Sequence, residues 1–214
     1  MKIRHEMFMA LFYKDQTIYN ELFKNINSFS LFENRLRKLS KNKSELLGYD
    51  PGENGENKMK GDLFEIFIEG FIHLCGSHSS LCISSYVPVD IGSDNGVDGT
   101  GLCLRSKPLT VQIKYRSEVT YELKEPDLKQ FWGQSIVKYG VDKDVIGNMV
   151  VITNCAGLHW YTHTTVLLEK ARTISRKDII SIINNNKCFW DNMKIIMNET
   201  FKENLGDDFE YAWI

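Results

Sequence analysis

Apolar and polar residues alternate along the middle of the chain in a pattern that predicts a β-hairpin. Apolar residues dominate 102–104 and 109–115, and the turn-forming run Arg-Ser-Lys-Pro at 105–108 separates these two segments. Successive strand residues point to opposite faces, so Gln112 and Lys114 share one face of the second strand. Two polar side chains on one face of an apolar strand indicate either a solvated surface or a functional site.

Asp98 precedes the first strand of this hairpin and lies between Gly96 and Gly99. Pairing of the two strands is expected to bring Asp98 beside Gln112, with Lys114 on the same face. A carboxylate and an amide oxygen are hard ligands suited to Mg²⁺ or Mn²⁺, and a neighbouring lysine suits a phosphate or a reacting water. The alternative is a solvated strand face that follows an Asp in a glycine-rich turn.

The rest of the chain shows helical spacing at both ends and strand patterns between them. Residues 5–47 contain no glycine or proline and predict two or three helices. The elements predicted next are a helix at 59–74, strands at 82–88, 99–105 and 109–116, a helix at 126–139 and a strand at 146–153. Two further helices are predicted, one after the cap-like Ser175 and one from Phe189 to about Asn204. The fold class predicted from this order is α/β.

The run Gly-Tyr-Asp-Pro-Gly-Glu-Asn-Gly-Glu-Asn at 48–57 is dense in turn formers and predicts a domain boundary or loop. The predicted organisation is therefore a helical N-terminal extension at 1–57, a core at 58–170, and C-terminal helices at 171–214 packed on the core. A chain of 214 residues is long enough for one such core with additions.

Composition limits the function only weakly. The formal net charge of −2 excludes a global basic field that would drive strong non-specific DNA binding, so any contact with nucleic acid must come from a local patch. Five cysteines without a CxxC pair are typical of reduced thiols in a cytoplasmic protein. The apolar run at 7–13 is too short to span a membrane and lacks a signal-cleavage pattern, so we expect an intracellular protein.

Asp98 together with the sequence Gln112-Ile113-Lys114 resembles the active-site motif of the PD-(D/E)xK, or restriction-endonuclease-like, nucleases, particularly the Mrr-like and Holliday-junction-resolvase-like branch. That family has an acid near the start of one strand, and an acid or Gln, any residue, then Lys on the next. Its upstream helix commonly supplies a Glu, which Glu65 matches. The predicted order of elements is also that of the family, so the resemblance implies an αβββαβ core with a central mixed sheet and helical additions at both ends.

The resemblance implies a metal-dependent endonuclease that hydrolyses phosphodiester bonds in DNA. Asp98, Gln112 and Glu65 would hold Mg²⁺, for which Mn²⁺ can substitute, and Lys114 would help to generate or position the hydroxide. However, Val97 replaces the Pro of the family motif, and Gln112 replaces its more common acid. These departures imply weaker metal binding or lost activity. The alternative is a catalytically impaired nuclease-fold subunit that binds DNA or assembles with a partner protein.

Several polar residues are candidates for contact with DNA. Arg116 shares the face of Lys114 by strand alternation, and the resemblance implies that Gln134, on the helix at 126–139, helps to bind DNA. Basic residues around the predicted loop are further candidates, with a solvated helix face as the alternative; they are Arg35, Arg37, Lys38, Lys41, Lys43, Lys58 and Lys60. Cleavage of both strands by one small site favours a homodimer. The resemblance also implies a helicase, a methyltransferase or another subunit as a possible partner.

Overall fold

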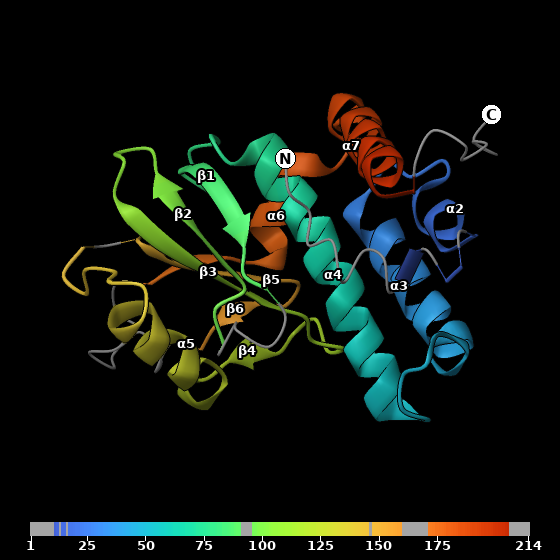
Figure 1. Ribbon diagram of the computed structural model, residues 1–214, viewed down its shortest axis with the longest axis horizontal. Helices are drawn as coiled ribbons and strands as arrows, with labels where there is room; N and C mark the ends of the chain where they lie inside the picture. Colours follow the sequence, from blue (N-terminus) through green and yellow to red (C-terminus); the bar gives the residue numbers. More distant parts are fainter. Residues whose placement is uncertain are drawn as a thin grey trace. The chain divides into compact units, whose positions relative to one another are not determined.

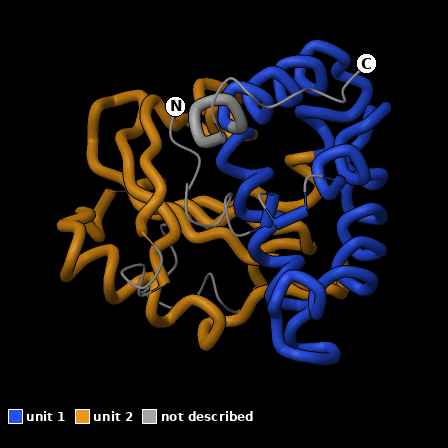
Figure 2. Tube along the Cα trace, turned by 45° about the vertical axis from the view of Figure 1, so that its right-hand side comes forward, with its two compact units in different colours: residues 1, 3–70, 180–214 blue, residues 2, 71–179 orange. Residues whose placement is uncertain are grey.

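The structure is a computed structural model that describes residues 11–12, 14–15, 17–90, 96–145, 147–159 and 171–205, with side chains described up to residue 200. In chain order, the described elements are α2 (Thr17–Phe23), α3 (Phe29–Lys43), η2 (Glu45–Leu47), α4 (Glu53–Cys75), β1 (Ile83–Pro88), β2 (Gly99–Cys103), β3 (Pro108–Lys114), β4 (Glu122–Leu123), α5 (Glu125–Val137), β5 (Met149–Thr153), β6 (Gly157–Leu158), β7 (Arg172–Ile174), α6 (Arg176–Ile183) and α7 (Lys187–Leu205) (Figure 1). Contacts divide the described chain into two compact units (Figure 2). Unit 1 contains the described residues up to 70 and from 180 onward, and unit 2 contains those between 71 and 179.

Unit 2 is built on a mixed sheet with the strand order β1-β2-β3-β5-β7. β1, β2 and β3 pair antiparallel in succession, whereas β5 pairs parallel with both β3 and β7. The short strands β4 and β6 form a separate parallel pair. Residues 109–113 of β3 and all of β5 are buried, which is expected of strands that are covered on both faces. The predicted α/β class with a central mixed sheet is confirmed.

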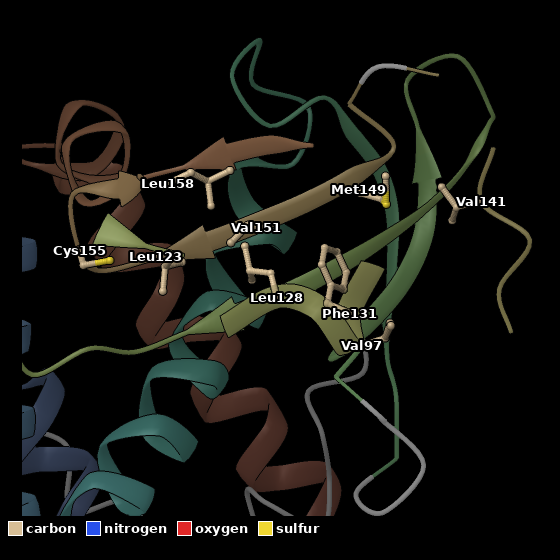
Figure 3. Close-up of a cluster of buried hydrophobic side chains, with 9 residues drawn as sticks. All are labelled: Val97, Leu123, Leu128, Phe131, Val141, Met149, Val151, Cys155 and Leu158. Carbon is tan, nitrogen blue, oxygen red and sulfur yellow. The ribbon is translucent and has the colours of Figure 1, made fainter. Parts of the chain in front are cut away.

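Helix α5 covers one face of this sheet. Its buried apolar side chains, Leu128 and Phe131, belong to a buried cluster made of Val97, Leu123, Leu128, Phe131, Val141, Met149, Val151, Cys155 and Leu158 (Figure 3). A hydrogen bond of 2.7 Å from Thr110 Oγ1 to Ser135 Oγ also joins β3 to α5. Gln112 is the partner of Val151 in the parallel register, and partner residues point to the same face of a sheet. Gln112 therefore lies on the face that α5 covers.

Unit 1 consists of helices packed around an aromatic cluster centred on Phe67 of α4. The Phe67 ring stacks on Phe32 of α3 with centroids 4.2 Å apart, and the ring of Trp190 in α7 is 6.1 Å away. All three side chains are buried. Helices that are far apart in the sequence are thus joined by one cluster of rings, which bury large apolar areas and prefer such offset or tilted contacts.

The predicted elements are all found, although most of their ends differ by one to six residues. The sequence pattern does not predict the short strands β4, β6 and β7. The helix predicted at 59–74 begins at Glu53, the strand predicted from 146 begins at Met149, and the strand predicted to end at 116 ends at Lys114. The N-terminal run at 7–13 lies largely outside the described residues. None of the described helices combines the length and the apolar character needed to cross a membrane.

The second half of the run at 48–57 is therefore helical rather than a loop. Gly52, with a φ of 78°, turns the chain just before the helix starts. A Cβ on Gly55 would lie 1.8 Å from the main-chain oxygen of Asp50, so this tight entry requires glycine. Turn-forming residues at this point shape the start of α4 and do not end it. The predicted boundaries at 57 and 170 stay predictions.

Replacing Phe67 with Ala should lower the free energy of unfolding by about 3–5 kcal/mol, because a buried ring is lost and its neighbours cannot fully close the cavity. Urea unfolding followed by circular dichroism measures this change. Phe67→Leu should cost less, and Leu46→Ala, at a side chain that is 82% exposed, should change the free energy by less than about 0.5 kcal/mol. Equal losses in the free energy of unfolding for Phe67→Ala and Leu46→Ala would contradict the role of the aromatic cluster.

Candidate active site

Asp98 is a buried carboxylate just before β2, with 4% of its surface exposed. Its Oδ2 accepts a hydrogen bond from the main-chain N–H of Ile113 and another, 2.7 Å long, from Gln112 Nε2. Removing a carboxylate from water is costly unless such donors compensate it. The structure thus brings Asp98 and Gln112 together, as the strand pattern predicts.

Two glycines hold the chain on the path that Asp98 requires. A Cβ on Gly99 would lie 2.1 Å from Cε2 of Tyr86, because the Tyr86 ring packs directly on the main chain there. Gly96 has a φ of 85°, in the left-handed region, and a Cβ there would lie 3.1 Å from the main-chain nitrogen of Phe131. The glycines in Gly-Val-Asp-Gly are therefore explained by the close approach of neighbouring atoms around one carboxylate.

Gln112 and Lys114 complete what we call the β2–β3 site, which consists of Asp98, Gln112 and Lys114. Gln112 is 2% exposed, and its amide nitrogen donates to Asp98. The amide oxygen is the atom of this side chain that can ligate a cation. Lys114 is the last residue of β3, is partly exposed, and lies on the same face as Gln112.

Side chains at the end of β5 anchor the chain around Lys114. Thr153 Oγ1 donates to the main-chain oxygen of Lys114 at 2.7 Å. Asn154, which is fully buried, accepts from the main-chain nitrogen of Arg116 at 2.6 Å and donates to its oxygen at 2.9 Å. The sequence pattern does not single out either residue, because a polar pair after an apolar strand is also the ordinary signal of a turn.

Arg116 lies beyond the end of β3, so strand alternation does not extend to it. Its Nη2 is 2.8 Å from Asp127 Oδ1, and its guanidinium carbon lies 5.6 Å from the ring centroid of Tyr121. The Tyr121 hydroxyl donates to the other oxygen of Asp127 at 3.0 Å. This cluster ties the segment after β3 to the first turn of α5. Contact between Arg116 and a phosphate stays a prediction. It would require the guanidinium to contact the phosphate and Asp127 at the same time.

Asp127 accepts several hydrogen bonds that favour its charged form. Burial by itself would raise the pKa of this carboxyl, but donation from the Lys124 main-chain N–H, from Arg116 and from Tyr121 outweighs burial and holds the pKa below its ordinary value of 3.8. The Tyr121 hydroxyl donates to this carboxylate, which raises the pKa of the phenol. The carboxylate is therefore part of the folded structure and is charged at neutral pH.

Glu65 lies on α4 in unit 1, whereas the β2–β3 site belongs to unit 2. Within unit 1, burial raises the pKa of the Tyr49 phenol, and the carboxylates of Asp62 and Glu65 add to this effect. Tyr49 donates a 2.7 Å hydrogen bond to Asp62. Glu65 is therefore near Tyr49, and its role as a metal ligand stays a prediction.

The other predicted DNA contacts lie in different surroundings. Lys58 is exposed, with Nζ 3.8 Å from Asp62 and 5.8 Å from the Tyr49 ring centroid. Lys60 is buried, and its Nζ donates to Asn57 Oδ1 at 3.2 Å, so phosphate contact there would require the side chain to move out to solvent. Gln134 lies on α5 and is partly exposed. Its role in DNA binding stays a prediction.

The donor set of the β2–β3 site suits Mg²⁺, although it is small. The Asp98 carboxylate and the Gln112 amide offer hard oxygens, and Mg²⁺ commonly binds proteins through one or two carboxylates while keeping several waters. Among the residues that the structure describes, no three or more His, Cys, Asp and Glu side chains gather around a possible metal position.

No protein-family model matches the sequence, and no curated protein matches it either.

Replacing Gln112 with Glu should lower the melting temperature in chelator, because Asp98 loses a donor and gains a like charge beside it. The free energy of unfolding should fall by about 1–3 kcal/mol. Added Mg²⁺ should stabilise Gln112→Glu more than it stabilises the wild type, because a cation relieves the repulsion between two carboxylates. Thermal melting with and without Mg²⁺ measures both effects, and an unchanged melting temperature in chelator would contradict the contact.

Replacing Asp127 with Asn should lower the free energy of unfolding by about 1–2 kcal/mol at neutral pH, because hydrogen bonds to a charged acceptor are weakened. The folded-state pKa of Asp127 is lowered, so its contribution is present above the unfolded-state pKa of about 3.9 and is lost as pH falls through the folded-state value. Urea unfolding at several pH values should therefore show the wild type and the variant converging in acid. If the difference in free energy of unfolding between the wild type and Asp127→Asn stayed constant below about pH 3, this account would be refuted.

Proposed function

We propose that this protein is a metal-dependent endonuclease that hydrolyses phosphodiester bonds in DNA, with a restriction-endonuclease-like core. The observation that carries the proposal is the buried hydrogen bond between Asp98 and Gln112, with Lys114 on the same strand face. The described elements α4, β1, β2, β3, α5 and β5 support it, because they follow one another in the αβββαβ order of that core, with the two-residue strand β4 inserted before α5.

The chemistry requires positive charge at one fixed place. Hydrolysis of a phosphodiester builds negative charge on a group that is already anionic, so groups that stabilise this charge must be positioned before the reaction. In our proposal Lys114 supplies a fixed ammonium that binds the scissile phosphate or positions the attacking water. Thr153 holds the main-chain oxygen of that lysine and Asn154 holds the main chain two residues later, and this limits movement of the ammonium.

Asp98 and the Gln112 oxygen would hold Mg²⁺ or Mn²⁺. When bound, such an ion polarises the phosphoryl group and lowers the pKa of water. Asp98 also keeps a structural task, since its Oδ2 accepts from the main chain of Ile113. The Gln112 Nε2 bond orients its amide so that the nitrogen faces the carboxylate.

A second candidate function is a nuclease-fold subunit that binds DNA or assembles with a partner and does not cut by itself. The observation that favours it is that Gln112 stands beside Asp98, where a second acid is more common in the family that the sequence resembles. An uncharged amide contributes less to metal affinity than a carboxylate does. A partner such as a helicase, a methyltransferase or a second copy of the chain would then be needed for cleavage.

The proposal predicts cleavage of DNA that requires Mg²⁺ or Mn²⁺ and stops with chelator. Lys114→Ala and Asp98→Asn should each lower the cleavage rate by about 100-fold or more, on the scale of losing one electrostatic catalytic group. Asp98→Asn retains an oxygen that can accept from the Ile113 N–H, so it tests charge with less damage to the fold than Ala. The substrates are supercoiled plasmid, linear duplex, single-stranded DNA and a four-way junction.

Lys107→Ala is the matched control, because Lys107 is exposed in the turn before β3, at the opposite end of that strand from Lys114. It should cut as the wild type does, and melting curves should show that all variants fold. DNA binding by the wild type without any cutting would favour the non-cutting subunit. Cutting that survives Lys114→Ala and Asp98→Asn would refute the assignment of the β2–β3 site.

A further inference from the structure

Two adjoining hollows lie in unit 1 around the loop between α2 and α3. The first has a volume of about 450 Å³ and is lined by Asn20, Glu21, Lys24, Asn25, Arg35, Lys38 and Leu39. The second has a volume of about 330 Å³ and is lined by Asn25, Ile26, Asn27, Asn185, Lys187, Trp190, Asp191 and Lys194. Because Asn25 lines both, the two hollows follow one another, and we call them together the α2–α3 groove.

The loop that separates the hollows is held in place from α3. Arg35 Nη1 donates to the main-chain oxygens of Leu22 and Lys24, which are carbonyls at the C-terminal end of α2. A cation is favourable there because the last carbonyls of a helix carry partial negative charge. Asn25 adopts a φ of 54°, a left-handed conformation that asparagine tolerates better than most residues. The hydrogen bonds of Arg35 and the conformation of Asn25 therefore fix the shape of the loop that borders the groove.

Positive charge in the first hollow exceeds what its acid can balance. Lys24, Arg35 and Lys38 are its basic lining residues, and Glu21 is its acid. The Glu21 carboxylate is already 2.8 Å from Lys43 Nζ. Among the described residues, neither Lys24 nor Lys38 is in an ion pair, and both side chains are exposed.

The second hollow adds two lysines around one acid. Asp191 lies 2.6 Å from Lys187 Nζ and 3.6 Å from Lys194 Nζ, so one carboxylate is shared by two ammonium groups. Both hollows therefore attract anions, although the whole chain has a formal net charge of −2. Local fields of this kind decide binding when the total charge does not.

The lining favours a nucleic acid over a protein partner. The apolar lining residues Ile26, Leu39 and Trp190 are at most 4% exposed, so the apolar surface of the groove comes mainly from the carbon atoms of its polar side chains and not from an apolar anchor of the kind that protein interfaces use. What it does offer is ammonium and guanidinium groups beside asparagine amides, and side chains of these kinds contact phosphates and sugars.

We propose that the α2–α3 groove binds the phosphate backbone of a nucleic acid, separately from the β2–β3 site. Two consecutive basic hollows suit a polyanion with repeated charges better than one small anion, which would fill a single hollow. The choice of nucleic acid among polyanions rests on the proposed nuclease function. The groove is a binding surface, and no catalytic step is assigned to it.

The test is the binding of fluorescent duplex and single-stranded oligonucleotides by the full chain, measured by anisotropy in chelator so that no cutting occurs. The double variant Lys24→Glu and Lys38→Glu should bind about tenfold or more weakly than the wild type at moderate salt. The slope of log affinity against log salt should also become shallower by about two, one for each lost phosphate contact. Arg35 is left intact because it caps α2.

The matched control is the double variant Lys107→Glu and Lys143→Glu, which makes the same charge change at exposed turn positions in unit 2. It should keep the wild-type affinity and salt slope. The proposal is overturned if the two double variants bind equally well, if the wild type binds neither oligonucleotide, or if it binds poly-L-glutamate as tightly as DNA. Inorganic phosphate and the oligonucleotides are also compared as stabilisers against thermal melting. The proposal is overturned if inorganic phosphate, but neither oligonucleotide, stabilises the wild type and fails to stabilise the Lys24 and Lys38 variant.

Cleavage measured on the same proteins separates this inference from the nuclease proposal. Wild-type binding that is lost in the Lys24 and Lys38 variant, without cutting by any protein, supports the groove and contradicts the self-sufficient nuclease. Cutting that requires Lys114, combined with unchanged binding by the Lys24 and Lys38 variant, supports the nuclease and overturns the groove.

Discussion

The structure of unit 2 depends on β3, which is hydrogen-bonded along both edges and buried on both faces. It pairs antiparallel with β2 and parallel with β5, so its position is determined from both sides. A strand buried in this way loses stability if it slips by one residue, because every side chain would move to the opposite face. The same constraint places Gln112 and Lys114 on the side of the sheet that α5 covers, and the end of β5 holds the end of β3 through Thr153 and Asn154.

Asp98 links this framework to the proposed chemistry. Its carboxylate is stabilised by a main-chain donor from Ile113 and a side-chain donor from Gln112, so this group contributes to folding and, in our proposal, would also offer an oxygen to a cation. A residue that both makes structural hydrogen bonds and binds a metal tolerates fewer substitutions than a residue with one role, because a substitution that improves metal binding disturbs the hydrogen bonds. Gln112 shows this compromise: an amide satisfies the buried carboxylate without a cation, whereas an acid in its place would depend on one.

Charge is distributed differently in the two units. In unit 2, Arg116 is engaged by Asp127 and stacked near Tyr121, so the basic group expected to contact phosphate also holds α5 in place. In unit 1, Lys43 draws Glu21 into an ion pair, and this leaves the basic residues of the α2–α3 groove with little local compensation. A chain with slightly more acids than bases can therefore still present a basic surface, because an acid that is already in an ion pair no longer neutralises the other basic residues around it.

The sequence by itself determined the order of the longer helices and strands, the β2–β3 hairpin and the neighbouring positions of Asp98 and Gln112, but not the short strands β4, β6 and β7. These features follow from local periodicity, turn residues and the two-residue repeat of a strand, all of which operate over short distances along the chain. Only the tertiary structure decided that α4 begins at Glu53, that Arg116 pairs with Asp127, and that Asn154 clamps the segment after β3. It also decided that helices from both ends of the chain meet around Phe67. These outcomes depend on contacts between residues far apart in sequence, where burial and hydrogen bonding outweigh local propensity.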